Sequence, residues 1–258
     1  MKMKTSPKIY FASDVHLGST VFESPRETEK RFVRWLDAIK EDAGALYLLG
    51  DIFDFWFEYK KVVPRGFVRF LGKIAEMHDK GVEVHFFTGN HDIWIFDYLP
   101  QETGVILHKE PLLTEIAGKQ FYLAHGDGLG DDSRLFQLIR SIFHNRTCQR
   151  LFACFPSRLG IGFAHKWARH NRGKDLKHPA PYFGEDKERL VLYAKKYLLE
   201  HPGVDYFIFG HRHILLDLML PPKTQMMIIG DWIHYFSYAV FDGNKLSLCR
   251  WNELSSPH

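Results

Sequence analysis

The sequence predicts an α/β protein built around a parallel sheet. Between residues 8 and 92, short apolar runs typical of buried strands alternate with stretches whose apolar residues recur at helical spacing. The expected strands are 8–12, 45–49 and 82–87, and the expected helices are 26–40 and 65–79. Polar residues follow each strand, and the carboxyl edge of a parallel sheet is where such folds place ligands. We therefore expect a functional site at this edge.

The second half of the chain predicts further strands and one helix-rich insertion. Residues 112–116 and 120–124 flank Ala117-Gly118-Lys119 and predict a hairpin. A helix is expected at 184–200, and strands at 205–209, 214–220, 226–229, 235–241 and 245–250. Residues 129–178 lose strand character and carry many Arg and Lys among apolar residues at helical spacing. We expect a single domain over 1–258, with 129–178 inserted in it as a helical cap.

Composition limits the class of protein. A chain of 258 residues with 45% hydrophobic content can bury the core of one large domain. The three cysteines fit neither a disulfide framework nor a zinc-binding CxxC pattern, which favours a reducing, cytoplasmic location. No apolar run approaches the roughly 18–20 residues that span a bilayer, and we see no signal peptide. The net charge of +3 is small, so we expect no nucleic-acid partner.

Five expected strand ends carry side chains that bind metal ions. These segments are Asp14-x-His16, Gly50-Asp51-x-x-Asp54, Gly89-Asn90-His91-Asp92, His125-Gly126-Asp127 and Gly210-His211-x-His213. In extended chain, residues i and i+2 point to the same side, so Asp14 and His16 can aim at one point. Any one segment alone is more often a polar loop end. Five in this order are very improbable by chance, and together they predict a metal site.

The five segments resemble the signature of the calcineurin-like metallophosphoesterase superfamily: D-x-H, GD-x-x-D, GNH-D/E, an H near GD, and GH-x-H. The resemblance covers roughly residues 8–127 and 184–250. It implies a β-sandwich of two mixed sheets flanked by helices, and two divalent ions bridged by one aspartate. The implied ligands of the first ion are Asp14, His16, Asp51 and His213. The implied ligands of the second are Asp51, Asn90, His125 and His211.

This resemblance also implies the chemistry. Two ions bind the oxygens of an anionic phosphate ester, acidify a bridging water and stabilise in-line displacement. Mixed His, Asp and Asn ligands suit Mn²⁺, Fe or Zn²⁺, and of these we expect Mn²⁺. His91 is implied to contact the phosphoryl group or the leaving oxygen, with Asp54 orienting its ring. The alternative for His91 is a structural histidine beside the ligands.

Two segments resemble one branch of the superfamily, the UDP-2,3-diacylglucosamine hydrolases of lipid A synthesis. Gly50 to Trp56 is similar to their GD-L-F-E-x-W segment, and His125 to Asp132 to their HGD-x-L-x-x-DD segment, one residue shorter. The resemblance makes Trp56, Asp131 and Asp132 candidate substrate contacts. The chain departs from that branch at His91, where those enzymes have arginine.

The cap composition fits a nucleotide-linked glycolipid substrate. Arg and Lys offer charge for a pyrophosphate, and Leu, Ile and Phe offer apolar surface for acyl chains. Arg169 and Lys174 are the candidate phosphate contacts, and the cap could also lie peripherally on the anionic inner membrane. The alternative is a pair of amphipathic helices with solvated basic faces.

The expected reaction is hydrolysis of UDP-2,3-diacylglucosamine to UMP and 2,3-diacylglucosamine 1-phosphate. Two alternatives remain. The first is another dinuclear-metal phosphodiesterase or nuclease of the same superfamily. The second is a non-catalytic scaffold, which should have lost ligand residues that this chain retains.

Overall fold

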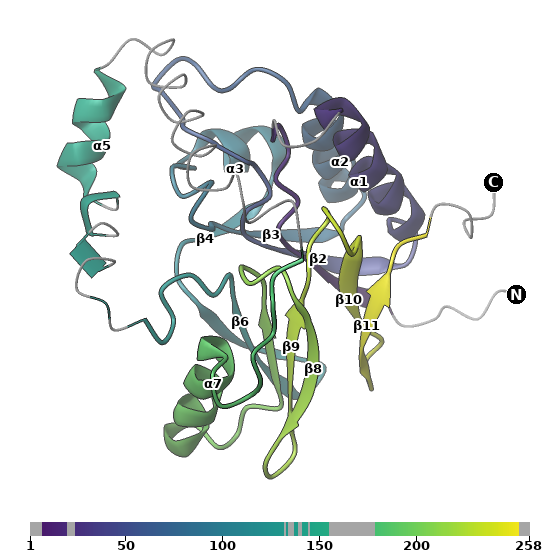
Figure 1. Cartoon of the computed structure of the whole chain (residues 1–258). Helices are drawn as coiled ribbons and strands as arrows, with labels where there is room; N and C mark the ends of the chain where they lie inside the picture. The colour runs from purple at the N-terminus through teal and green to yellow at the C-terminus, as the bar shows by residue number, and fades with distance from the viewer. Residues whose placement is uncertain are drawn as a thin grey trace, which may run out of the picture.

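Two mixed β-sheets face each other, and helices cover their outer surfaces (Figure 1). The computed structural model describes residues 7–19, 24–131, 133, 137–138, 141–143, 145–154 and 179–252. This architecture confirms the predicted sandwich of two mixed sheets flanked by helices. Among the helices of these residues, none is long and apolar enough to cross a membrane.

The first sheet contains the parallel strands that the sequence predicts. Its strand order is β11-β10-β1-β2-β3-β4, with β1 to β4 parallel and β10 antiparallel to β1. The strands are β1 (Lys8–Ala12), β2 (Ala43–Leu49), β3 (Glu83–Phe87), β4 (Ile106–His108), β10 (Ser237–Phe241) and β11 (Leu246–Arg250). Tyr10 of β1 pairs with Leu46 on one side and Val240 on the other. A strand from the end of the chain therefore borders the first strand.

The second sheet has the order β5-β6-β7-β9-β8. Its strands are β5 (Leu112–Ile116), β6 (Lys119–Ala124), β7 (Tyr206–Phe209), β8 (Leu215–Leu220) and β9 (Thr224–Ile229). Strands β6, β7 and β9 run parallel, while the outer strands β5 and β8 pair antiparallel. Since β6, β7 and β9 are parallel neighbours, their carboxyl ends lie at one edge of this sheet.

Helices pack on the outer faces because each has one apolar side. Helices α1 (Pro25–Ile39), α2 (Val68–Asp79) and α3 (Tyr98–Thr103) share a core with the first sheet, and α7 (Arg189–Glu200) covers the second. Helix α1 buries Phe32, Trp35 and Leu36, which recur at helical spacing. Helix α5 (Arg146–Ala153) lies within the 129–178 stretch, which the structure describes only in part.

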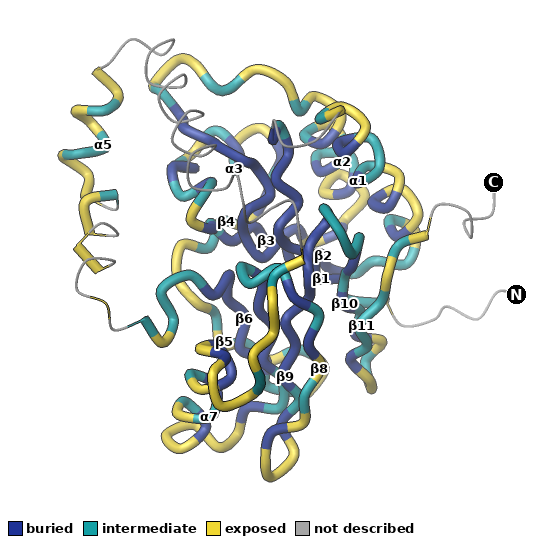
Figure 2. The backbone as a smooth tube through the Cα atoms, in the orientation of Figure 1, coloured by how far each residue is buried: buried dark blue, intermediate teal, exposed yellow. Residues whose placement is uncertain are grey.

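The hydrophobic core has three layers, one between the two sheets and one between each sheet and its helices. Successive residues of a strand point to opposite sides and so contribute to different layers. In β1, Tyr10 and Ala12 face the helices, while Phe11 lies between the sheets on Phe121 of β6, with ring centroids 6.0 Å apart. Figure 2 shows the central strands almost continuously buried, and the outer turns of the helices exposed. Two buried sheets hold the backbone rigidly up to the strand ends, where the polar loops begin.

Candidate metal centre

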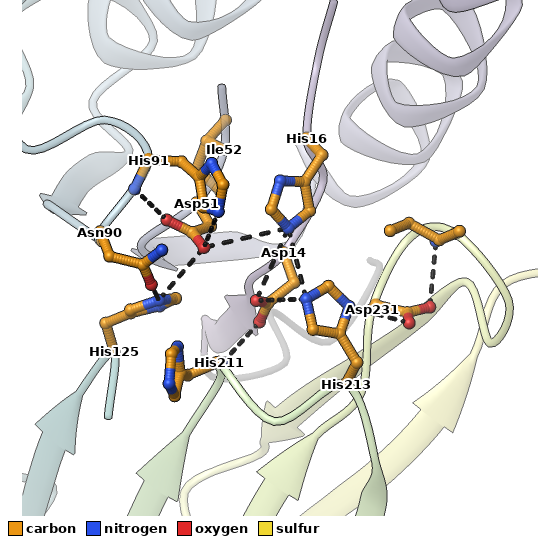
Figure 3. A network of polar contacts seen from close by, with 12 residues as sticks. Asp14, His16, Asp51, Ile52, Asn90, His91, His125, His211, His213 and Asp231 are labelled. Atoms are coloured by element: carbon orange, nitrogen blue, oxygen red, sulfur yellow. Dashed lines mark hydrogen bonds and ion pairs between the residues drawn. The ribbon is translucent and has the colours of Figure 1, made fainter. Parts of the chain in front are cut away.

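The five polar segments converge at the carboxyl ends of strands from both sheets (Figure 3). Asp14 and Asp51 follow β1 and β2, while His125 and His211 follow β6 and β7. Three groups of side chains place ligand atoms within 4.8 Å of one another. These groups are Asp14 with His16 and His213, His16 with Asp51 and His91, and Asp51 with His125 and His211.

The backbone is strained where it carries these side chains. Asp14, His16, Asp51, His211 and His213 have φ values of 54°, 49°, 53°, 67° and 49°, in the left-handed region that residues with a Cβ avoid. Each such residue costs of order 1–3 kcal/mol and persists only where the surroundings enforce it. Strain concentrated on candidate ligands indicates a site maintained for function.

Two glycines are required by close backbone approach. A Cβ on Gly210 would lie 2.6 Å from Asp14 Oδ2, and a Cβ on Gly89 would collide with the Asp51 carboxylate. The glycine backbone therefore packs directly against the two aspartates. Larger residues at either position would displace a carboxylate from the centre of the site.

The first cluster consists of Asp14, His16 and His213. His213 Nε2 lies 3.4 Å from Asp14 Oδ1 and 3.4 Å from His16 Nε2. Asp14 Oδ2 accepts a hydrogen bond from the His211 backbone N–H at 2.9 Å. The other oxygen, Asp14 Oδ1, is buried and has no hydrogen-bond partner among the residues described. A buried carboxylate oxygen facing two imidazole nitrogens is a position suited to a cation.

Asp231 fixes the orientation of His213. Asp231 Oδ2 is 3.1 Å from His213 Nδ1, so that nitrogen donates its proton to the carboxylate. Its other oxygen, Oδ1, accepts from the backbone N–H groups of Ile233, His234 and Tyr235 at 3.0, 2.7 and 3.1 Å. With Nδ1 acting as donor, the Nε2 of a neutral His213 presents a lone pair to the site, as in carboxylate–histidine–metal arrangements.

The second cluster consists of Asp51, Asn90, His125 and His211. His125 Nδ1 donates to the Leu49 carbonyl at 2.8 Å, so a neutral His125 presents the lone pair of Nε2. That nitrogen lies 3.4 Å from Asp51 Oδ2 and 3.3 Å from Asn90 Oδ1. Three acceptor atoms then face one another without a donor between them. Either a proton or a metal ion must compensate this arrangement.

The pKa values of the second cluster are shifted by the close approach of these side chains. Burial alone would raise the pKa of Asp51, but the facing His91 and His125 hold it well below its usual range. Burial lowers the pKa of His125, and Asp51 outweighs that effect and raises it well above its ordinary value. Burial and the neighbouring His125 lower the pKa of His211 well below its ordinary value, which leaves a neutral ring able to bind a metal ion.

These observations show that the residues fit divalent metal ions. The donor set combines carboxylate, imidazole and amide groups, which suits borderline first-row metals. Asp51 takes part in two of the three groups and faces ligands of both clusters, the position expected of a bridging carboxylate.

The ring of His91 lies against the backbone of Asp54. His91 Nδ1 lies 3.1 Å from the backbone carbonyl of Asp54, so it is this carbonyl that orients the ring. The Asp54 carboxylate instead lies 3.6 Å from His16 Nδ1. His91 Nε2 is 3.8 Å from Asp51 Oδ2 and faces the site. Asp54 therefore contacts the His91 ring through its backbone carbonyl, and the catalytic role of this pair stays a prediction.

The prediction that Trp56 contacts the substrate is corrected. Its side chain is 0% exposed, stacks on Phe53 at 4.3 Å and donates to Glu58 Oε1 at 3.1 Å. A fully buried indole cannot contact a substrate directly. Glu58 Oε2 accepts from the backbone N–H groups of Phe96, Asp97 and Tyr98, so Trp56 helps to hold the loop that follows His91.

The remaining predicted substrate contacts are mostly outside the described residues. Asp132, Arg169 and Lys174 are among the residues that the structure does not describe. Asp131 is described, and its carboxylate pairs with Arg189 at the start of α7 at 2.5 Å. Its role in substrate binding stays a prediction.

Sequence reasoning missed residues that hold the ligands in place. Asp231 follows Gly230 directly after β9, the same strand–Gly–Asp pattern as Gly50-Asp51, so the signal was present. Asp92 is buried and accepts from the backbone N–H groups of Gly89, Ile52 and Phe53, which joins the Asn90 loop to the Asp51 loop.

Glu188 is a further missed residue. It is 3% exposed and binds Arg212 through two contacts of 2.9 and 3.1 Å. Because Arg212 lies between His211 and His213, Glu188 anchors the loop that carries both histidines. No local sequence pattern identifies this pairing over 24 residues.

The sequence of this chain matches a family of phosphoesterases. The sequence profile of the calcineurin-like phosphoesterases matches residues 7–215. This chain belongs to the calcineurin-like phosphoesterase family. It is accordingly a metal-dependent hydrolase, and the family implies divalent metal ions in the centre described above.

Several similar proteins carry one name. The UDP-2,3-diacylglucosamine hydrolase of Porphyromonas gingivalis is 44% identical over 252 residues, covering 93% of this chain and 96% of that protein. The enzyme of the same name from Haemophilus influenzae is 31% identical, covering 86% and 90%. That of Neisseria meningitidis serogroup B is 28% identical, covering 91% and 94%. The predicted family and its lipid A branch are thereby confirmed.

Proposed function

We propose that this phosphoesterase hydrolyses the pyrophosphate of UDP-2,3-diacylglucosamine in lipid A synthesis. The products would be UMP and 2,3-diacylglucosamine 1-phosphate. The observation that carries the proposal is the similarity of this sequence to a UDP-2,3-diacylglucosamine hydrolase over nearly the full length of that enzyme. The candidate metal ligands of this chain also lie close together in one site. The match includes the segments on both sides of the cap, so it is not confined to motifs shared by the whole superfamily.

The two clusters define the proposed ligands. One divalent ion would be held by Asp14, His16, Asp51 and His213, and the other by Asp51, Asn90, His125 and His211. We propose Mn²⁺, since the mixed nitrogen and oxygen donors suit it. When bound, such a pair supplies Lewis acidity for the phosphate oxygens and lowers the pKa of water.

The protein groups around this centre position the substrate and a proton. The backbone N–H of His91 donates to Asp51 Oδ1 at 2.8 Å, which ties the His91 loop to the proposed bridging carboxylate. Since His91 Nδ1 is engaged by the Asp54 carbonyl, Nε2 is the atom available to the substrate. In its protonated form, His91 Nε2 would donate to a phosphoryl or leaving-group oxygen.

The cap supplies the lipid-binding part of the proposal. Phe152 of α5 packs on Phe57 and Trp94, with ring centroids 4.8 and 5.0 Å apart, and Trp94 donates to the Phe143 carbonyl at 2.9 Å. Leu151 of α5 is exposed. Basic and apolar side chains on one helix suit a substrate with a pyrophosphate and acyl chains, and also peripheral contact with an anionic membrane.

Hydrolysis in ¹⁸O-labelled water tests the proposal. Purified protein with Mn²⁺ would be given UDP-2,3-diacylglucosamine, a simple nucleoside diphosphate sugar, or single-stranded DNA in parallel reactions. We expect turnover of the lipid, with the label in UMP because attack is proposed at the phosphorus nearer uridine. Label in the sugar phosphate would refute that point of attack. Rapid cleavage of DNA without turnover of the lipid would refute the substrate.

A further inference from the structure

Two adjoining cavities border helix α5 and the candidate ligand His125. The larger has a volume of about 570 Å³, the smaller about 160 Å³, and Thr88 and Lys109 line both. The candidate ligand His125 lines the smaller cavity, and Arg146 and Arg150 of α5 line the larger one. Lys109 therefore lies at the junction of a cavity lined by one candidate ligand and a cavity lined by α5.

The larger cavity also borders the loop of Asn90 and His91. Thr88 precedes this loop by two residues and Ile93 follows it by two, and both line the cavity. A substrate whose phosphorus is held at Asn90 and His91 has this cavity beside it for its next group.

Lys109 is the basic residue that lines both cavities. Its ammonium lies over the Phe96 ring, 4.9 Å from the centroid, and forms no hydrogen bond or ion pair with any residue that the structure describes. Burial lowers the pKa of Lys109. The negative charge of Glu58 raises this pKa, and the positive charge of Arg146 lowers it further. Glu58 forms no direct ion pair with Lys109, and its two oxygens accept hydrogen bonds from Trp56 and from the 96–98 backbone.

Acidic side chains also line both cavities. Asp97 lines the larger cavity together with Arg146 and Arg150, while Glu110 and Asp127 line the smaller one. Burial lowers the pKa of His108 to about 4, so its ring is neutral. Lys109 is the one Lys or Arg in the described lining of the smaller cavity, where Glu110 and Asp127 outnumber it. In the larger cavity, Lys109, Arg146 and Arg150 outnumber Glu58 and Asp97.

We infer that Lys109 forms an anion subsite that binds the substrate phosphate that is not attacked, with Arg146 of α5 as its second cation. This rests on the proposed function and adds to it the residue that makes the enzyme prefer a pyrophosphate over a simple phosphodiester. The two ions held by the His and Asp side chains would compensate the charge of one phosphate. The adjacent phosphate carries its own negative charge, and Lys109 compensates it beside the His125 wall.

A substrate comparison tests this subsite. Wild-type protein, Lys109→Met, Lys109→Arg and Lys119→Met would be assayed with Mn²⁺ on UDP-2,3-diacylglucosamine and on bis(p-nitrophenyl) phosphate. Lys119 is a matched surface lysine, 3.5 Å from Asp205 and outside both cavity linings. For Lys109→Met we expect kcat/KM on the pyrophosphate to fall about tenfold or more, and activity on the diester to stay within about twofold of wild type. Lys109→Arg should retain most activity, and Lys119→Met all of it.

Inhibition constants separate this inference from the proposed function. UDP and UMP would compete with diester hydrolysis while Mn²⁺ is kept in excess over nucleotide. Wild-type protein should bind UDP more tightly than UMP, and Lys109→Met should lose that preference. Equal binding of the two nucleotides by wild-type protein, or an unchanged preference in Lys109→Met, would overturn the subsite. Failure to hydrolyse the lipid, with the UDP preference present and dependent on Lys109, would overturn the proposed function and support the subsite.

Discussion

The variant Asp231→Asn tests whether the site depends on the proton position of His213. Asn can keep one oxygen for the three backbone N–H groups that Asp231 Oδ1 binds. Its amide nitrogen then replaces Oδ2, 3.1 Å from His213 Nδ1, and a donor faces a donor. His213 relieves this clash by moving its proton to Nε2, which is the nitrogen facing Asp14. The variant thus leaves the His213 ring in place but puts a proton on Nε2, so that this nitrogen can no longer bind a metal ion.

The expected magnitude follows from these contacts. Loss of a hydrogen-bonded partner behind a histidine ligand weakens metal affinity by about 10–100-fold, or about 1.4–2.7 kcal/mol. Hydrogen bonds to a charged group contribute about 1.5–3 kcal/mol and those to a neutral group about 0.5–1.5 kcal/mol, so metal-free Asp231→Asn should lose about 1–2 kcal/mol of stability. Asp231→Ala would leave all three backbone donors at a fully buried position and should lose more.

Calorimetric titration with Mn²⁺ and thermal unfolding with and without the metal provide the assay. Asp217→Asn is the matched control, because Asp217 is exposed on β8 and its side chain accepts a hydrogen bond from the Gln225 side chain, away from the candidate ligands. We expect the control to match wild type in both measurements. Wild-type Mn²⁺ affinity in Asp231→Asn would refute the assigned tautomer of His213.

Three further predictions concern other parts of the site. Asp51→Ala should lose Mn²⁺ binding in calorimetry, whereas His91→Ala should keep it and lose kcat; an emptied metal site in His91→Ala would show that this residue is a ligand. Glu188→Gln should weaken the contact with Arg212 and lower kcat/KM about tenfold, with Mn²⁺ affinity falling in parallel; unchanged affinity would contradict a positioning role. Phe152→Ala should raise KM for the lipid several-fold and leave diester hydrolysis unchanged; equal loss on both substrates would instead indicate a general loss of folding.

Local pattern predicted the central elements well. Strand β1 matches the prediction at both ends, and β2, β3 and α1 differ by one or two residues, because long apolar periodicity leaves few alternatives. Helix α7 begins at Arg189, later than the predicted residue 184, since Glu185 to Lys187 form a turn. Helix α3 and strand β4 were missed: one contains Pro100, the other spans three residues, and neither provides enough periodicity to be recognised.

The candidate ligands were predictable because of where they stand in the chain. Each metal-capable segment follows an apolar run, and parallel strands bring their carboxyl ends together. The pairing of β10 with β1 was not predictable, because no local signal links strands separated by most of the chain.

The direction of each side chain was decided only by the tertiary structure. Trp56 faces the core, although the sequence suggested a substrate contact, and Asp54 turns its carboxylate toward His16 and its carbonyl toward His91. Asp231 and Glu188 lie far along the chain from most of the residues they help to position. The residue types and their order determined the chemistry of this protein, whereas backbone strain, burial and long-range pairing determined which atom of each residue faces the centre.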